Sequence, residues 1–165
     1  MTDAASPRSR PRIFNTAFES GLRSLVLLTA CYPVRLGLRR LVVLDHLVVH
    51  TGDIDGPESL HPEEESRAAE LLVRRQLVDS GLSLMGTRSL IIRHATAEGF
   101  RYEAGEEAGS FVDLLRADYT VRLKERAAWL SENVIPLSED KINDLVRHRV
   151  DRWASEFQVD HGVAT

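Results

Sequence analysis

The sequence contains a single cysteine, Cys31, among its 165 residues. One cysteine forms no internal disulfide, which is typical of a protein kept in the reducing cytoplasm. No histidine lies near Cys31 in the sequence to activate its thiol, so a buried, inert side chain is the expected state. We therefore expect a cytoplasmic chain that does not use cysteine as a nucleophile.

Long hydrophobic runs are also missing. No stretch approaches the roughly 20 apolar residues of a membrane span, and the densest one, residues 41–49, is interrupted by Asp45 and His46. Residues 1–12 are rich in Ser, Pro and Arg and lack the apolar segment of a signal peptide. The sequence predicts a disordered arm over residues 1–12 and no association with a membrane.

Motifs for phosphate or metal chemistry are sparse. The glycines lack the Gly-Lys-Ser/Thr context of a phosphate loop. His46 and His50 share a helix face and His61 follows, so a zinc-dependent hydrolase is one hypothesis. Against it, Leu47 stands where the metalloprotease helix carries its glutamate. We expect no enzymatic activity, metal, cofactor or small-molecule substrate, and we interpret His46 as a hydrogen-bonded core histidine.

Charge is low overall and uneven along the chain. A net charge of -4 is not that of a typical nucleic-acid-binding protein. Residues 51–66 are strongly acidic, whereas residues 67–94 carry an excess of arginine. Solvated loops around a helix would explain this pattern, but an acidic loop next to a basic helix also favours selection of a partner by charge.

The hydrophobic pattern predicts helices first, then a hairpin, then further helices. Asn15 or Thr16 is placed to cap the first helix with Glu19 in its first turn, and Gly81 weakens the third. His50 and Asp53 read as the cap and turn that end the second helix. The predicted elements are helices at 14–31, 38–50 and 66–85, strands at 89–93 and 100–104, and helices at 106–115, 119–134 and 138–157.

Three helices followed by a hairpin is the order of a winged helix-turn-helix. We predict a mainly α fold with a small β-hairpin, namely a winged helix-turn-helix-like domain with added C-terminal helices. This single domain would span residues 13–157 and be followed by a flexible tail over 158–165. Trp129, Trp153 and Phe157 are expected to anchor the C-terminal helices on the core.

A winged fold raises the hypothesis of DNA binding. The third helix would enter the major groove and the hairpin would contact the backbone. The acidic loop that precedes this helix would repel phosphates, so we rank DNA binding below protein binding. The arginines that would contact DNA are Arg67, Arg74, Arg75, Arg88 and Arg93.

Several short motifs occur in a fixed order. The first runs from Phe14 to Arg23 as F-N-T-x-F-E-x-G-L-R, and the second from Leu44-Asp45 to Asp53. The others are S-L-H-P at 59–62, E-L-L-V-R-R-x-L-V at 70–78, G-F-x-Y at 99–102 and A-x-W at 127–129. In this order and spacing they resemble the type 2 middle components of bacterial ABC three-component systems, over residues 13–157. Ala17 departs from the usual proline and His46 from the usual aromatic residue.

The resemblance implies a role in bacterial defence against phage and other invading DNA. Such systems combine an SMC- or Rad50-like ABC ATPase, a small middle component and an effector, and the middle component acts as a non-catalytic adaptor. Nucleic acid would then be contacted only through the complex. The resemblance directs attention, as partner contacts, to Asn15, Glu19, Arg23, His50, Asp53, His61, Glu70, Arg74 and Arg75. On this view Arg74 and Arg75 share an exposed face of the third helix.

Overall fold

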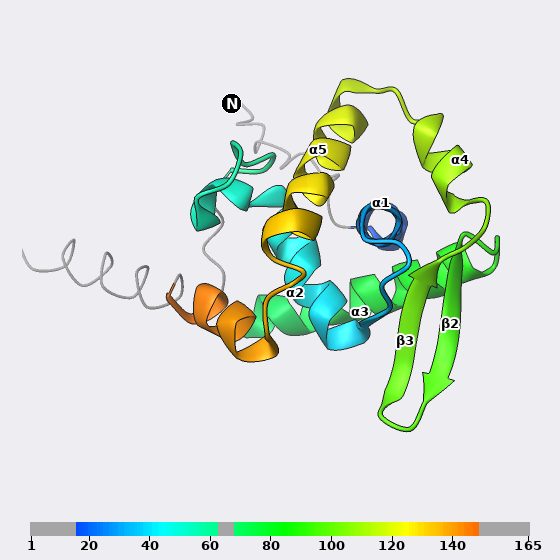
Figure 1. Ribbon diagram of the computed structural model, residues 1–165, viewed down its shortest axis with the longest axis horizontal. Helices are drawn as coiled ribbons and strands as arrows, with labels where there is room; N and C mark the ends of the chain where they lie inside the picture. The colour runs from blue at the N-terminus through cyan, green and yellow to red at the C-terminus, as the bar shows by residue number, and fades with distance from the viewer. Residues whose placement is uncertain (1–15, 63–67, 149–165) are drawn as a thin grey trace, which may run out of the picture.

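A computed structural model describes residues 16–62 and 68–148, and side chains in the third helix from Val73 onward. The chain is mainly helical, with a small three-stranded antiparallel sheet (Figure 1). The elements are α1 Ala17–Ala30, β1 Leu36–Gly37, α2 Leu38–Val49, the short 3-10 helix η1 Thr51–Ile54, α3 Ala68–Gly86, β2 Ile91–Thr96, β3 Gly99–Ala104, α4 Ala108–Asp113 and α5 Asp118–Asn133. Residues 139–148 are also helical.

Helix α1 begins with a capping box. The Thr16 hydroxyl oxygen accepts a hydrogen bond from the Glu19 amide at 3.2 Å, and the Glu19 carboxylate accepts one from the Thr16 amide at 3.4 Å. This reciprocal pair satisfies two donors that a helix start leaves without partners. The prediction that Thr16 caps the helix with Glu19 in its first turn is confirmed, while Asn15 lies outside the described residues.

Helices α1 and α3 cross at two glycines. A Cβ added to Gly21 would lie 2.7 Å from the carbonyl oxygen of Gly81, so the two backbones are in direct contact. Helix α3 continues through Gly81 to Gly86. The weakening expected at Gly81 does not break the helix, because here glycine serves close helix packing and the contact with α1 compensates for its poor helix propensity.

Helix α2 is central, as its apolar sequence predicts. Leu41, Leu44 and Val48 are fully buried in it, and its neighbours include α1, α3 and α5. After α2 the chain turns at η1, and hydrogen bonds from α5 hold the loop that follows η1. The Arg126 guanidinium donates to the Glu58 carbonyl oxygen from Nε at 3.1 Å and from Nη2 at 2.9 Å.

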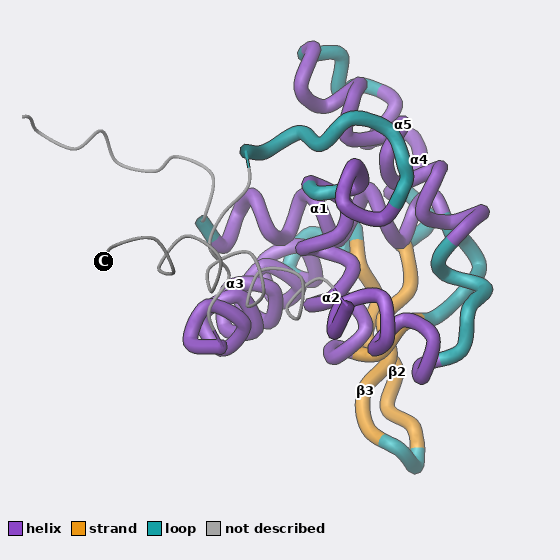
Figure 2. Tube along the Cα trace, turned by 90° about the vertical axis from the view of Figure 1, so that its left-hand side faces the viewer, coloured by secondary structure: helices purple, strands orange, loops and turns teal. Residues whose placement is uncertain are grey.

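The sheet has the strand order β1-β3-β2. The hairpin of β2 and β3 was predicted, although β2 begins at Ile91 because Ser89 adopts a left-handed conformation with φ 56°. Strand β1 was not predicted, since two residues carry no alternating pattern. Leu36 of β1 pairs with Tyr102 of β3. Figures 1 and 2 show the hairpin projecting from the helical body.

The C-terminal helices follow the predicted order: α4 is shorter than the predicted 106–115, and α5 is displaced by one residue from the predicted 119–134. Helices α4 and α5 lie within or close to the predicted segments, and Trp129 packs partly buried against the core. Trp153, Phe157, the predicted arm over 1–12 and the predicted tail over 158–165 lie outside the described residues. Within the described part of the chain, no helix has both the length and the apolarity needed to cross a bilayer.

Candidate functional site

Asp45 of α2 is the centre of a buried cluster of charged side chains. Its carboxylate is fully buried and accepts two hydrogen bonds from Arg23 of α1, at 2.7 Å from Nε and 3.2 Å from Nη2. Arg74 of α3 donates a third from Nη1 at 2.7 Å. A buried carboxylate is costly unless it is paired and hydrogen-bonded. Asp45 thus joins α1, α2 and α3 through one side chain.

Arg23 has further partners in this cluster. Its Nη2 also donates to the Ser20 hydroxyl at 3.0 Å. Burial by itself would lower the pKa of Arg23, but the charge of Asp45 and the hydrogen bonds to it hold that pKa above its ordinary value. Tyr119 of α5 interacts with the charge of Arg23. Burial raises the pKa of the Tyr119 hydroxyl, and the positive charge of Arg23 opposes this rise. The cluster therefore extends to a fourth helix.

Three histidines continue the cluster towards the loop behind α2. The rings of His46 and His50 are 4.6 Å apart between centroids, and His61 meets His50 edge-on at 6.1 Å. The His61 Nε2 and the Tyr119 hydroxyl are 2.9 Å apart and hydrogen-bonded. The amide of His61 donates to the Val49 carbonyl oxygen at 3.1 Å, which returns the loop to the end of α2. These contacts fix the loop that carries the S-L-H-P motif.

His50 ends α2, as the sequence predicts. It is the C-cap residue and is buried, and its Nδ1 lies 4.0 Å from the Asp53 carboxylate in η1. For the metal hypothesis on His46, His50 and His61, the geometry offers no support. Among residues 16–62 and 68–148, no group of three or more His, Cys, Asp or Glu side chains is placed to hold a metal ion.

The proposed partner residues do not form one exposed face. Arg23, His50 and Arg74 are buried, at 3%, 3% and 7% exposure. The expectation that Arg74 shares an exposed face with Arg75 is wrong, because Arg74 lies one turn before the buried Val78 and neutralises Asp45. Arg75, one residue on, is exposed.

The remaining predicted contacts differ in exposure. Glu19, Asp53 and His61 are partly buried, and the first two make the cap and turn contacts described above. Asn15 lies outside the described residues, as does Arg67 from the predicted DNA contacts. Glu70 belongs to α3, but its side chain is outside the described part of that helix.

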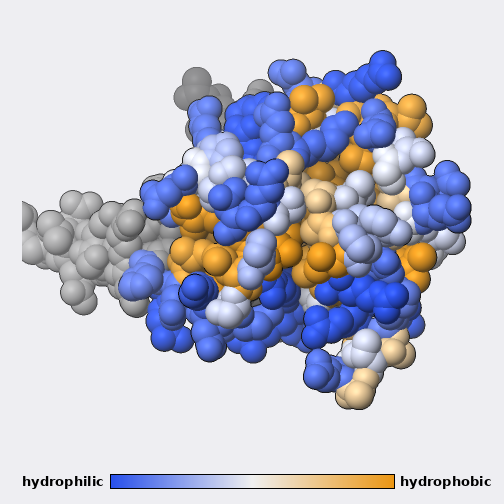
Figure 3. All heavy atoms as spheres, in the orientation of Figure 1, coloured by the Kyte–Doolittle hydropathy of each residue, from blue (hydrophilic) through white to orange (hydrophobic). Residues whose placement is uncertain are grey.

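Two of the arginines predicted to contact DNA are exposed near the hairpin. Arg88 follows the end of α3, and the guanidinium of Arg93 in β2 lies 4.3 Å from the centroid of the Phe100 ring. Glu98 at the hairpin tip pairs with Arg101 at 3.3 Å. In the view of Figure 3, hydrophobic side chains gather in the middle of the face and hydrophilic ones surround them. The surface of the hairpin carries charges of both signs, since Glu98 lies there with Arg93 and Arg101.

Sequence reasoning missed the central role of Asp45 and the contribution of Tyr119. A signal for Asp45 was present, since it is the one acidic residue within the apolar run 41–49. A charge in such a helix requires a buried cation, and the partners on α1 and α3 were already marked by the motifs. Nothing in the local pattern around Tyr119 indicated that its hydroxyl meets His61.

The cluster explains why the motifs are spaced along the whole chain. The first supplies Arg23, the second Asp45 and His50, the S-L-H-P motif His61, and the α3 motif Arg74. These four motifs thus contribute to one network of contacts, whereas the motifs at 99–102 and 127–129 supply none of these residues.

Comparisons with known proteins identify a family for this chain. Neither the curated proteins nor the solved structures gave a significant match. A family model does match, and it covers residues 13–156, which include every residue of the buried cluster. The chain therefore belongs to the family of ABC-three component (ABC-3C) system Middle Component 2.

Proposed function

We propose that this chain is the non-catalytic adaptor of an ABC three-component defence system in the bacterial cytoplasm. It docks on the SMC- or Rad50-like ATPase and couples that ATPase to an effector. The observation that carries this proposal is membership of the middle-component family across residues 13–156. A middle component has other proteins as partners, and the small mixed helical body contributes surfaces to meet them.

The buried cluster suits an adaptor that transmits a change between two partners. Asp45 ties three helices together, and Arg126 fixes the loop behind α2 on α5. Packed interiors and hydrogen-bonded networks move as a unit, because they resist gradual deformation. A force applied at one face would therefore reach the opposite face as a rigid-body displacement.

The docking face that we propose is centred on Arg75 of α3. Asp53, His61 and Glu19, each partly exposed, are secondary contacts. Arg23, His50 and Arg74 support this face from the interior. Asn15 and Glu70 stay in the proposal as contacts carried by the family motifs. An exposed arginine is the kind of residue that interfaces favour, since its planar group forms several directional hydrogen bonds.

Charge reversal at Arg75 tests the proposed face. Arg75→Glu should weaken binding to the system's ATPase by at least tenfold, because an attractive contact becomes a repulsive one. Arg122→Glu is the matched control, since Arg122 is exposed on α5 and the change in net charge is the same. Equal binding by both folded variants would remove Arg75 from the docking face.

DNA binding by a winged helix is the second candidate. The order of three helices and a hairpin, the strand order β1-β3-β2 and the exposed Arg88 and Arg93 support it. Because Arg74 is buried, it is removed from the cations that a DNA-binding face would use. This function predicts duplex binding that falls steeply with salt concentration. Negligible binding at low salt would eliminate it.

A further inference from the structure

The outer edge of strand β2 is open for pairing. Strand β2 lies at the edge of the sheet and pairs with β3 on its other side. Thr96 pairs with Gly99 and Ile92 pairs with Glu103. Because hydrogen-bonded and non-hydrogen-bonded pairs alternate along an antiparallel ladder, the even-numbered residues of β2 are the ones that hydrogen-bond to β3. The bond from the Gly105 amide to the Leu90 carbonyl oxygen, at 2.8 Å, continues this series.

The odd-numbered residues of β2 therefore direct their backbone groups away from β3. These are Ile91, Arg93 and Ala95. Among the described residues, no backbone carbonyl outside the helices and strands accepts a hydrogen bond from the amide of Arg93 or Ala95. A row of such groups is a template for an added strand.

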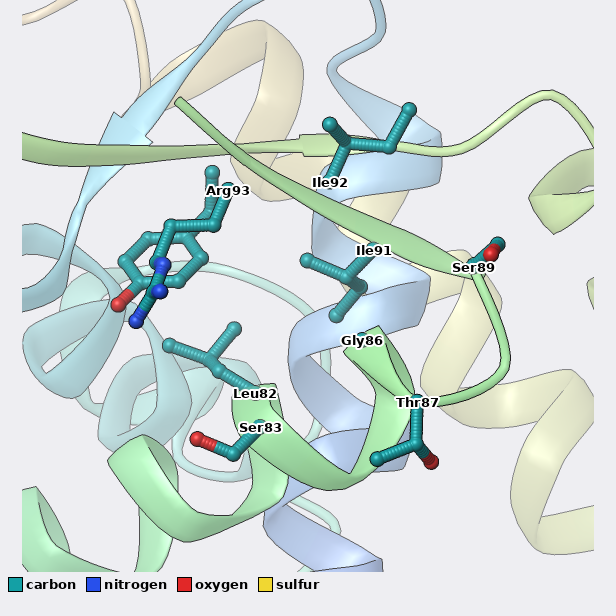
Figure 4. A pocket seen from close by; sticks show the side chains of 9 residues that line it. Leu82, Ser83, Gly86, Thr87, Ser89, Ile91, Ile92 and Arg93 are labelled. Carbon is teal, nitrogen blue, oxygen red and sulfur yellow. The ribbon is translucent and has the colours of Figure 1, made fainter. Parts of the chain in front are cut away.

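A groove runs beside this edge, between β2 and the last turns of α3. Its volume is about 630 Å³, and its lining includes Leu82 and Gly86 of α3 with Ile91 and Arg93 of β2. Figure 4 shows Leu82 and Ile91 pointing into the space, with Arg93 at one side of it. Tyr102, which faces Arg93 across the β2–β3 pair, also lines the groove. A Cβ added to Gly86 would be in van der Waals contact with the Ile91 carbonyl oxygen, at 3.8 Å, so the end of α3 lies beside the start of this edge and the open part begins at Arg93. Side chains of an added strand would enter this groove.

The charge of the lining indicates the chemistry of the occupant. Arg93 is the charged residue among those that line the groove, and Arg88 lies between the lining residues Thr87 and Ser89. An extended segment with acidic and apolar residues matches this combination. A second copy of the chain matches it poorly, because pairing β2 with β2 would place two Arg93 side chains in one short ladder.

We propose that β2 receives an extended acidic and apolar segment of another component of the same system, which adds a fourth strand to the sheet. The inference rests on the adaptor function proposed above. Backbone hydrogen bonds from Arg93 and Ala95 hold the segment, an apolar side chain of the segment enters the groove, and its carboxylates pair with Arg93. The site differs from the Arg75 face, so one adaptor has two places to bind.

Amide hydrogen exchange on the reconstituted complex tests the geometry. The full chain is mixed with the ATPase and the effector of its system, exchange is quenched, and the amides are read by NMR on the re-isolated chain. We expect exchange at Arg93 and Ala95 to slow at least tenfold in the complex. The amides of Ile92 and His94, already bonded to β3, serve as internal controls. Unchanged exchange at both outward amides would overturn the proposal.

A matched pair of variants tests the same site by affinity. Ala95→Pro removes an amide that faces outward and keeps the bonds to β3, so the hairpin should survive, as edge strands tolerate proline. Ala95→Val keeps the amide. We expect Ala95→Pro to weaken complex formation about tenfold and Ala95→Val to leave it unchanged. Arg93→Glu should also weaken binding, whereas Arg101→Glu on the opposite face of the hairpin should not.

The outcomes separate this inference from the adaptor function. If the complex forms equally well with Ala95→Pro and the amides stay unprotected, the strand-addition site is wrong and the adaptor function stands. If the wild-type chain binds neither component, both fail together. If duplex DNA in place of the proteins protects Arg93 and Ala95, the groove belongs to a DNA-binding face and the proposal is wrong.

Discussion

At the scale of single residues, the contact between α1, α2 and α3 depends on the Asp45 carboxylate. It is fully buried and bound by Arg23 and Arg74. Removing one partner of a buried ion pair costs far more than breaking a surface pair, because the remaining charges stay buried without compensation. The motif residues should therefore matter first for folding and only then for binding.

Asp45→Asn should lower the free energy of unfolding by about 3–5 kcal/mol, as for other buried pairs that lose one partner. Glu139→Gln is the control, since it breaks an exposed pair with Arg40 and should cost less than about 1 kcal/mol. Urea unfolding followed by circular dichroism measures both. Equal losses for the two variants would show that the buried cluster contributes no special stability.

Cys31 should be unreactive in the folded chain. Burial raises the pKa of its thiol to about 11 from an ordinary 9.0, and the thiolate is the reactive form. Below pH 9 the thiol is protonated in both states, and between pH 9 and 11 only the unfolded chain loses the proton, which disfavours folding there. Labelling with a disulfide reagent at pH 8 should be slow until denaturant is added. Fast labelling of the native chain would contradict the buried state.

The sequence identified most residues of the cluster but assigned some the wrong environment. Arg74 and Arg75 are adjacent and chemically identical, but Arg74 lies on the buried side of α3 with Val78 and pairs with Asp45. Helical periodicity placed both arginines away from the predicted apolar stripe of the third helix, so both were predicted to be exposed. The partner that buries Arg74 lies on another helix. Long-range pairing of this kind is invisible to local pattern.

At the scale of elements, the crossing of α1 and α3 depends on two glycines. Gly21→Ala should destabilise the fold by about 1–3 kcal/mol, because its Cβ would meet the Gly81 backbone, which has no flexible side chain to move aside. Thermal unfolding gives the measure.

Gly109→Ala is the matched control for that substitution. Nothing lies within 4 Å of a Cβ added at Gly109 in α4. The variant should be neutral or gain up to about 1 kcal/mol, since alanine is the better helix former. A stabilised Gly21→Ala variant would mean that the helices cross less closely than described.

The order of the helices and strands could be predicted from the sequence. Their exact ends and their roles in packing could be predicted only in part. The capping box at Thr16 and the hairpin turn carry local signals, so they were found. The two-residue β1 and the close approach at Gly81 depend on partners distant in sequence, which periodicity does not report. Gly81 shows the difference well, because the same residue signals weakness locally and tight packing in three dimensions.

At the scale of the whole molecule, the motifs and the surfaces have different tasks. Four of the motifs supply a buried cluster that joins α1, α2 and α3 and reaches Tyr119 of α5 through His61. Contact of the motif residues with a partner stays a proposal. The docking face that we propose is centred on Arg75, and the edge of β2 is a second proposed binding site.

The central claim is that the chain links two larger proteins, and assembly of purified components tests it most directly. Mass photometry of the ATPase and effector, with and without the full chain, gives the measurement. We predict that the ATPase and the effector enter one complex only when the chain is present. Arg75→Glu should reduce the amount of this complex, and Arg122→Glu should not. An ATPase–effector complex that forms equally well without the chain would contradict the account.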